Sequence, residues 1–146
     1  MTVKEERSGW RDEMLSQRHR DWGFNCPAID IDFLLIEYNS AKVKALVEYK
    51  HERAFIPHMS SQSFRAIADL GNRADIPVFL CVYSDDLETF KVSALNGKAK
   101  SWCAQDGAVF TEQQWVRLLY DVRGFGDMSL DAKLYFQRKR KAKVNG

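Results

Sequence analysis

The chain has 146 residues, of which 45% are hydrophobic and 29% are charged, with a formal net charge of +2 at pH 7. This composition is typical of a globular protein and excludes an intrinsically disordered chain, and the length predicts a single domain over 1–146. No apolar stretch approaches the roughly 20 residues that cross a bilayer, and the first residues lack the apolar core of a signal peptide. We therefore expect a cytoplasmic protein without a membrane partner. The widely spaced Cys26, Cys81 and Cys103 predict neither a disulfide framework nor a zinc site.

Good helix formers predict a first helix over residues 3–20, and the Gly, Asn and Pro content of residues 21–27 predicts a loop. Two apolar runs follow, separated by a polar break. They predict a β-hairpin with strands over 29–38 and 43–51, joined by a turn at 39–42.

After the hairpin, Ser60 or Ser61 can cap a helix that runs to about Gly71. The apolar sequence VFLCVY at 78–83 is typical of a central strand covered on both faces. Apolar residues at alternate positions then predict a further strand over 90–94.

The sequence TEQQ at 111–114 is a capping-box pattern, which opens a helix that ends at Gly124. Ser129 caps a last helix, which runs into a basic tail at about 137–146. The order of these elements predicts an α/β protein with a central mixed β-sheet flanked by helices.

Charged side chains stand at the open end of the predicted hairpin. Side chains alternate between the faces of a strand, so Asp30 and Asp32 share a face. Glu48 and Lys50 share a face in the same way. If the turn centres near residue 40, Asp32 lies opposite Glu48, with their Cβ atoms roughly 4.5–5.5 Å apart. Asp30 then lies opposite Lys50, whereas a slip of one residue would put the two pairs on opposite faces.

Two carboxylates this close repel each other unless a cation compensates. Mg²⁺ binds one or two carboxylates and completes its octahedron with water and substrate phosphate. It polarises a phosphoryl oxygen and provides a hydroxide nucleophile, while an ammonium group such as that of Lys50 can orient the attacking water. The pattern therefore permits phosphodiester hydrolysis. The alternative is an ion-paired hairpin end, in which Lys50 neutralises Asp30 or Glu48.

This arrangement resembles the motif of the PD-(D/E)XK nuclease superfamily. Asp32, or Asp30, precedes the sequence EYK at 48–50 by 16 to 18 residues. The stretch CPAIDIDF stands where the family has its Pro-Asp element, and ALVEYKH resembles its Glu-x-Lys strand. The resemblance covers about residues 3–95. It departs from the family pattern at Pro27, which is not directly followed by an aspartate, so the first acidic residue is ambiguous.

The resemblance implies a restriction-endonuclease-like αβββαβ core and a Mg²⁺-dependent nuclease that cleaves DNA. Asp32 and Glu48 would then hold the Mg²⁺, for which Mn²⁺ can substitute, together with the backbone carbonyl of Tyr49. Lys50 would assist the attacking water. Asp32 is favoured because it faces Glu48 in the symmetric register, and Asp30 is then an auxiliary acid or a partner for Lys50.

The resemblance also suggests auxiliary residues. Many members add a glutamate from the first helix, for which Glu13 is the best-placed candidate, and Gln62 resembles a glutamine that some members use near the site. A solvated glutamate and an ordinary polar cap residue are the simpler interpretations. Basic side chains near the first helix are candidates for gripping phosphates, although exposed arginines are usually only solvated: Arg11, Arg18, His19 and Arg20.

The expected partner is DNA, in a homodimer or a larger nucleoprotein assembly. The principal alternative is a catalytically silent nuclease-fold protein that binds nucleic acid or serves as an assembly subunit. A third is a structural α/β domain whose hairpin ends in ion pairs.

Overall fold

The computed structural model describes residues 10–23, 29–124 and 127–145. The chain divides into two compact units, Met1–Asp30 and Ile31–Gly146. The first unit contains helix α1, Trp10–Asp21. The start of the helix predicted at residue 3 lies outside the described residues, and a single domain over the whole chain stays a prediction.

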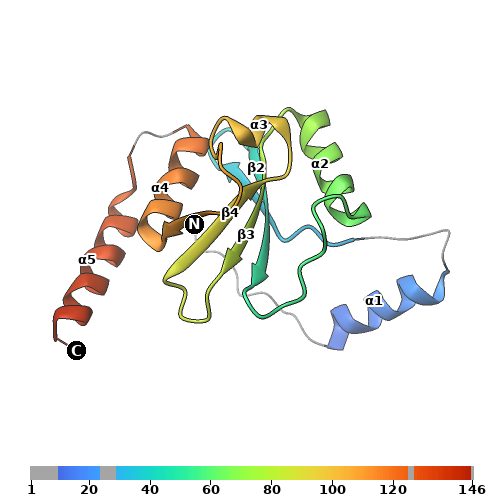
Figure 1. Ribbon diagram of the computed structural model, residues 1–146, viewed down its shortest axis with the longest axis horizontal. Coiled ribbons are helices and arrows are strands. Elements are labelled where there is room, and N and C mark those ends of the chain that lie inside the picture. The colour runs from blue at the N-terminus through green and yellow to red at the C-terminus, as the bar shows by residue number, and fades with distance from the viewer. Residues whose placement is uncertain (1–9, 24–28, 125–126, 146) are drawn as a thin grey trace. The chain divides into compact units, whose positions relative to one another are not determined.

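The second unit is built on a five-stranded mixed sheet with the order β1-β2-β3-β4-β5 (Figure 1). Strands β2 and β3 are parallel, whereas the other neighbours pair antiparallel. The predicted mixed α/β architecture is therefore confirmed. The strands are β1 (Phe33–Glu37), β2 (Lys42–His51), β3 (Val78–Tyr83), β4 (Thr89–Ala94) and β5 (Ala108–Thr111).

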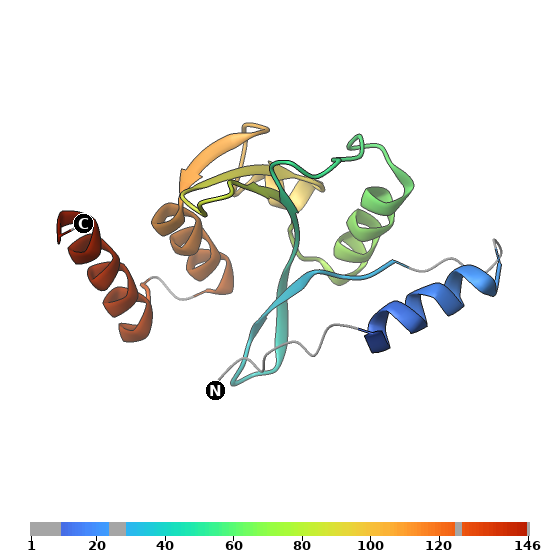
Figure 2. The same cartoon turned by 90° about the horizontal axis from the view of Figure 1, so that it is seen from below.

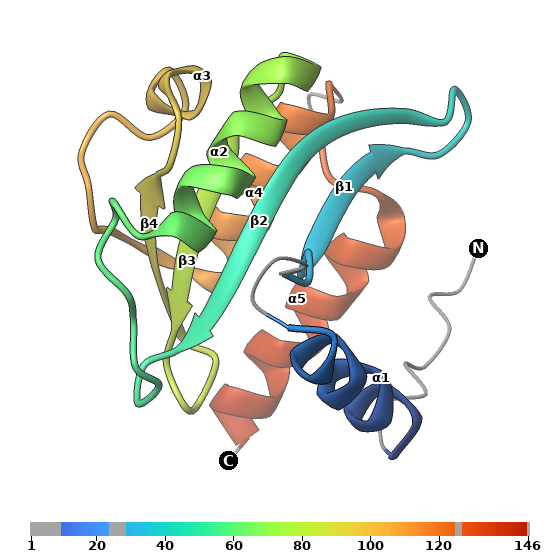
Figure 3. The same ribbon diagram turned by 90° about the vertical axis from the view of Figure 1, so that its right-hand side faces the viewer.

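Helices cover both faces of this sheet. The helices of this unit are α2 (Gln62–Ala74), α3 (Gly97–Lys100), α4 (Glu112–Arg123) and α5 (Leu130–Asn145). Figures 2 and 3 show α2 on one face and α4 on the other. Along β2, Val47 belongs to the core around Trp115 of α4, whereas Leu46 belongs to the core around Ile67 of α2. Side-chain alternation therefore places Glu48 and Lys50 on the α2 face.

Strand β1 begins at Phe33, later than the predicted start at residue 29. The Asp32 carboxylate accepts a hydrogen bond from the Tyr49 amide. This amide is therefore not available to extend the β1–β2 ladder beyond the pair of Phe33 and Val47. The described residues consequently contain two strands between α1 and α2, β1 and β2, where the αβββαβ pattern has three.

Helix α2 does not end near Gly71, as predicted, but continues to Ala74. Its last turn is closed by Asp75 in the left-handed conformation, with φ 59°. Gly71 serves packing, because a Cβ atom there would lie 2.1 Å from Cγ2 of Val78.

Other predictions are confirmed. Strand β3 is the central strand, and Cys81 within it is completely buried. Thr111 and Gln114 form the capping box of α4, and Gly124 ends that helix with φ 94°. The sequence did not predict β5 or the short helix α3. The basic segment 137–145 continues α5 as helix.

None of the described helices has the length and apolar character that spanning a membrane requires.

Asn96 joins several elements at the amino end of β3. This buried side chain accepts hydrogen bonds from the Val78 and Ala99 amides, both at 3.0 Å, and donates one of 2.9 Å to the Ile76 carbonyl. It therefore satisfies backbone groups at the end of the α2–β3 connection and at the start of α3.

We expect Asn96→Ala to lower the free energy of unfolding by about 3 kcal/mol, because it leaves buried backbone groups without partners. Urea unfolding measures this loss. Asn72→Ala on the exposed surface of α2 is the control and should change stability by less than about 0.5 kcal/mol. Equal effects of the two substitutions would contradict this role of Asn96.

Candidate functional site

The candidate site lies where β1 begins and β2 approaches its end. Phe33 pairs with Val47, so the preceding residue, Asp32, falls opposite Glu48. This is the register that the sequence predicts for this end of the hairpin. Next to the turn, however, Ile36 pairs with Val43, whereas the register of Phe33 with Val47 would pair Ile36 with Lys44. The irregularity lies between Leu35 and Ile36.

Glu48 is the central acidic group of the site. Its residue is only 8% exposed, on the sheet face that α2 covers. Burial raises the pKa of its carboxyl group, and the negative charge of Asp32 raises this pKa further. The Lys50 ammonium opposes these effects, with Nζ 3.6 Å from Oε1 of Glu48. The structure therefore brings together Asp32, Glu48 and Lys50.

Asp32 is positioned by the backbone of β2. Its Oδ2 accepts a 3.0 Å hydrogen bond from the amide of Tyr49. This contact holds the carboxylate beside Glu48 even though Asp32 precedes the first residue of β1. No sequence pattern predicts this contact, because it depends on the ladder ending at Phe33.

The backbone carbonyl of Tyr49 faces the same edge of β2. The amides of Leu46 and Glu52 donate to the carbonyls of Pro77 and Tyr83, so even-numbered residues of β2 direct their backbone groups toward β3. Residues at odd positions face the β1 side, because backbone groups alternate along a strand. Tyr49 therefore directs both its amide and its carbonyl toward the β1 side of β2, where the amide donates to Asp32.

The side chain of Tyr49 has a separate, structural role on the opposite face of the sheet. Its hydroxyl accepts a 3.0 Å hydrogen bond from Nε1 of Trp115. Burial raises the pKa of Tyr49 to about 12. The phenol therefore stays protonated at neutral pH and anchors β2 to α4.

For the other predicted site residues, no contact with this cluster is described. Asp30 belongs to the first unit, as do Arg18, His19 and Arg20 in the last turn of α1. The side chains of Arg11 and Glu13 lie outside the described residues. Gln62 is the exposed first residue of α2. The roles of these residues stay predictions.

Two residues at the carboxyl ends of β2 and β3 were not singled out from the sequence. His51, directly after Lys50, contacts Oδ1 of Asp85 through Nε2 at 3.0 Å. Nδ1 of His51 accepts a hydrogen bond from the amide of Arg53. Both ring nitrogens are engaged, so this histidine fixes the turn after β2 and is not placed as a base.

The candidate site has few protein ligands. Among the residues that the structure describes, no three or more His, Cys, Asp or Glu side chains gather in a way that could hold a metal ion. The cluster instead offers the Asp32 and Glu48 carboxylates, with the Tyr49 carbonyl on the same edge of the strand.

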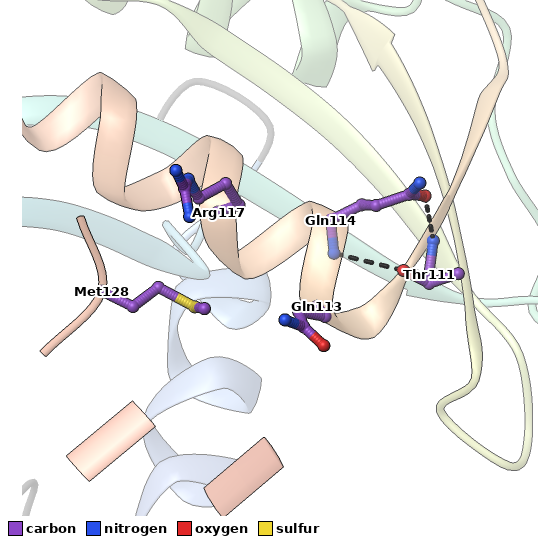
Figure 4. A pocket seen from close by; sticks show the side chains of 5 residues that line it. All are labelled: Thr111, Gln113, Gln114, Arg117 and Met128. Atoms are coloured by element: carbon purple, nitrogen blue, oxygen red, sulfur yellow. Dashed lines mark hydrogen bonds between the residues drawn. The ribbon is translucent and has the colours of Figure 1, made fainter. Parts of the chain in front are cut away.

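A shallow pocket of about 370 Å³ lies elsewhere, at the start of α4 (Figure 4). It is lined by Thr111, Gln113, Gln114, Arg117 and Met128. The guanidinium group of Arg117 lies 3.8 Å from the carboxylate of Asp127. The pocket shares no residue with the acidic cluster.

Comparisons of this chain with protein-family models, with curated proteins and with solved structures find no match.

The raised pKa of Glu48 predicts a pH dependence of stability. In metal-free protein the folded state binds this proton more tightly than the unfolded chain, whose pKa is near 4.5. Stability therefore falls as the pH rises through the folded pKa. We expect Glu48→Gln to be more stable than the wild type at about pH 7 and to lose this advantage at about pH 4, as measured by urea unfolding in EDTA.

Glu37, at the turn end of the same hairpin, is the control with the opposite sign. Hydrogen bonds from Ser40, and from the Asn39 amide, lower the pKa of Glu37. Its contribution to stability is present above the unfolded pKa and is lost as the pH falls. Glu37→Gln should therefore destabilise the protein at about pH 7. If Glu48→Gln also destabilised it there, Glu48 would be a structural partner of Lys50.

Proposed function

We propose that this protein is a Mg²⁺-dependent nuclease that hydrolyses phosphodiester bonds in DNA, with the metal held by Asp32 and Glu48. One observation carries the proposal: a buried glutamate lies beside a second carboxylate whose charge raises its pKa. Such a pair is unfavourable without a cation. The Lys50 ammonium is the only other charged group of the motif, and it compensates for one of the two negative charges.

The donor set suits Mg²⁺ chemically. Asp32 and Glu48 supply carboxylate oxygens, and Tyr49 supplies a backbone carbonyl on the same edge. Mg²⁺ prefers oxygen ligands and is often held by one or two carboxylates, with water and substrate phosphate completing the octahedron. A larger cluster of acidic side chains is therefore not required. Mn²⁺, which accepts the same oxygen ligands, is the expected substitute.

Each residue has a distinct task in this proposal. A bound Mg²⁺ would polarise a phosphoryl oxygen and lower the pKa of a bound water. Asp32, held by the Tyr49 amide, keeps its carboxylate oriented before substrate binds. Lys50, whose ammonium lies 3.6 Å from Glu48 and whose side chain is 30% exposed, orients the attacking water and stabilises negative charge that develops on the phosphate.

The finer fold assignment is part of the same proposal. A hairpin that carries the acidic motif, a crossover helix α2 and a parallel strand β3 agree with a restriction-endonuclease-like core. The structure differs from that core in having two strands, β1 and β2, between α1 and α2, where the core has three. The choice of DNA over RNA rests on the motif resemblance alone, and the proposed homodimer or nucleoprotein assembly rests on the small size of the chain.

The 3.6 Å contact between Lys50 and Glu48 also suits the second candidate, a catalytically silent protein that binds nucleic acid. In that case Lys50 serves only to neutralise Glu48, and the site does not need a metal.

Cleavage of plasmid DNA in Mg²⁺ distinguishes these functions. We expect Glu48→Gln and Lys50→Met each to lower the cleavage rate at least about a hundredfold, because each removes a charged group that acts on the reacting phosphate. Omitting the metal should abolish cleavage.

Matched controls come from the turn end of the same hairpin. Glu37 and Lys42 are a cross-strand pair there, and Glu37→Gln and Lys42→Met should leave the rate unchanged when the assay temperature is well below their unfolding temperatures. Binding of DNA without cleavage by the wild type would support the silent protein. Cleavage that survives Glu48→Gln would contradict the proposed site.

A further inference from the structure

Helix α5 is held against the rest of the second unit by one buried aromatic side chain and by acidic partners. Phe136 is only 4% exposed, and the Tyr135 hydroxyl donates a 2.6 Å hydrogen bond to Oε1 of Glu112. Lys139 forms ion pairs with Glu112 and with Glu88, and Lys143 lies 2.9 Å from Oε2 of Glu88. These contacts hold the helix against α4 and the β3–β4 turn.

Two further basic side chains of α5 face solvent, whereas Lys133 is paired with Asp127 at 2.7 Å. Arg138 and Lys141 are exposed, and neither forms an ion pair with another residue in the described part of the chain. They are three positions apart and therefore lie on the same side of the helix. Arg140 lies on a different side of the helix, four positions after the buried Phe136, and its Nη1 lies 3.5 Å from Oε1 of Gln113 in α4.

The charges of α5 are thus divided between two functions. Lys139 and Lys143 are neutralised by glutamates of the fold, whereas the exposed pair Arg138 and Lys141, here called the α5 basic face, is left uncompensated. A docked helix loses little further entropy on binding a ligand, and uncompensated cations on a fixed surface create a positive potential that attracts polyanions.

We infer that the α5 basic face binds the phosphate backbone of nucleic acid without reading its base sequence. Arginine and lysine side chains supply the donors that phosphates accept, and backbone contacts of this kind set affinity and position but carry no base specificity. This binding site goes beyond the proposed nuclease function and does not depend on it, because no residue of the α5 basic face belongs to the candidate active site.

The distribution of apolar residues favours nucleic acid over a lipid surface. Helices that lie on membranes have a continuous apolar face beside their basic residues. On α5 the most exposed apolar side chains, Leu130 and Val144, lie near opposite ends of the helix, at 69% and 84% exposure. No exposed large apolar residue lies between Tyr135 and Val144.

The position of the α5 basic face is also consistent with a nucleic-acid path. Glu88, which receives Lys139 and Lys143, lies in the turn after β3. Strand β2 is parallel to β3 and carries Lys50 near the same end. The basic face and the candidate site therefore lie toward the same end of the sheet, with α5 on the α4 side and Lys50 on the α2 side.

The test is DNA binding without cleavage. A short DNA duplex is titrated with protein in EDTA at several salt concentrations, so that the slope of log affinity against log salt is obtained. We expect the wild type to bind, and the double variant Arg138→Gln/Lys141→Gln to bind more weakly with a slope reduced by about 2, since each lost phosphate contact lowers the slope by about 0.9.

The matched control is Arg73→Gln/Lys98→Gln, which removes the same two residue types near the opposite end of β3, where both are paired with aspartates. Its slope should equal that of the wild type. Absence of wild-type binding at low salt would overturn the inference, as would a wild-type slope in the α5 variant or equal losses in both double variants. So would binding to phosphatidylserine vesicles that the α5 substitutions abolish while DNA affinity is unchanged. These outcomes do not depend on whether the protein is a nuclease, because the experiment measures binding in EDTA and not cleavage.

Discussion

The irregularity between Leu35 and Ile36 sets the register on which the candidate site depends. Near the turn, Ile36 pairs with Val43, and the same step continued along the strands would put Asp32 opposite Val47. Asp32 would then point to the α4 face of the sheet, away from Glu48. One extra residue on β2, as in a β-bulge, moves the pairing to Phe33 with Val47 and thereby brings the carboxylates of Asp32 and Glu48 together.

The fold holds this acidic pair in place from both sides of the sheet. On one face, Glu48 is buried next to the core of Leu46 and Ile67. On the other, the Tyr49 side chain is hydrogen-bonded to Trp115 of α4 and contacts its ring edge-on, with centroids 6.2 Å apart. A buried carboxylate beside a second one opposes folding unless it is compensated. In the proposed nuclease, a bound cation would provide this compensation.

The elements that carry strong local patterns were predicted well. The capping box of Thr111 and Gln114 and the apolar positions of α4 locate that helix, and the alternation of the hairpin places Asp32 opposite Glu48. The prediction of this register assumed a symmetric turn near residue 40. It did not include the irregularity between Leu35 and Ile36 that produces the register in the structure.

Other features depend on contacts between distant residues and were missed or wrong. Strand β5 and helix α3 have only four residues each, too few for a periodic pattern. Gly71 was predicted to end α2, whereas its role follows from the approach of Val78. The end of the β1 ladder depends on the bond between Asp32 and the Tyr49 amide, which no local pattern encodes.

Anomalous X-ray scattering from crystals soaked in Mn²⁺ is the most direct test of the account. We expect one strong anomalous peak between Asp32 and Glu48, within about 2.2 Å of an oxygen of each carboxylate. Crystals of Asp32→Asn should show no peak at this position. Crystals in which Mn²⁺ binds elsewhere while Lys50 remains paired with Glu48, and no peak lies between the carboxylates, would contradict it.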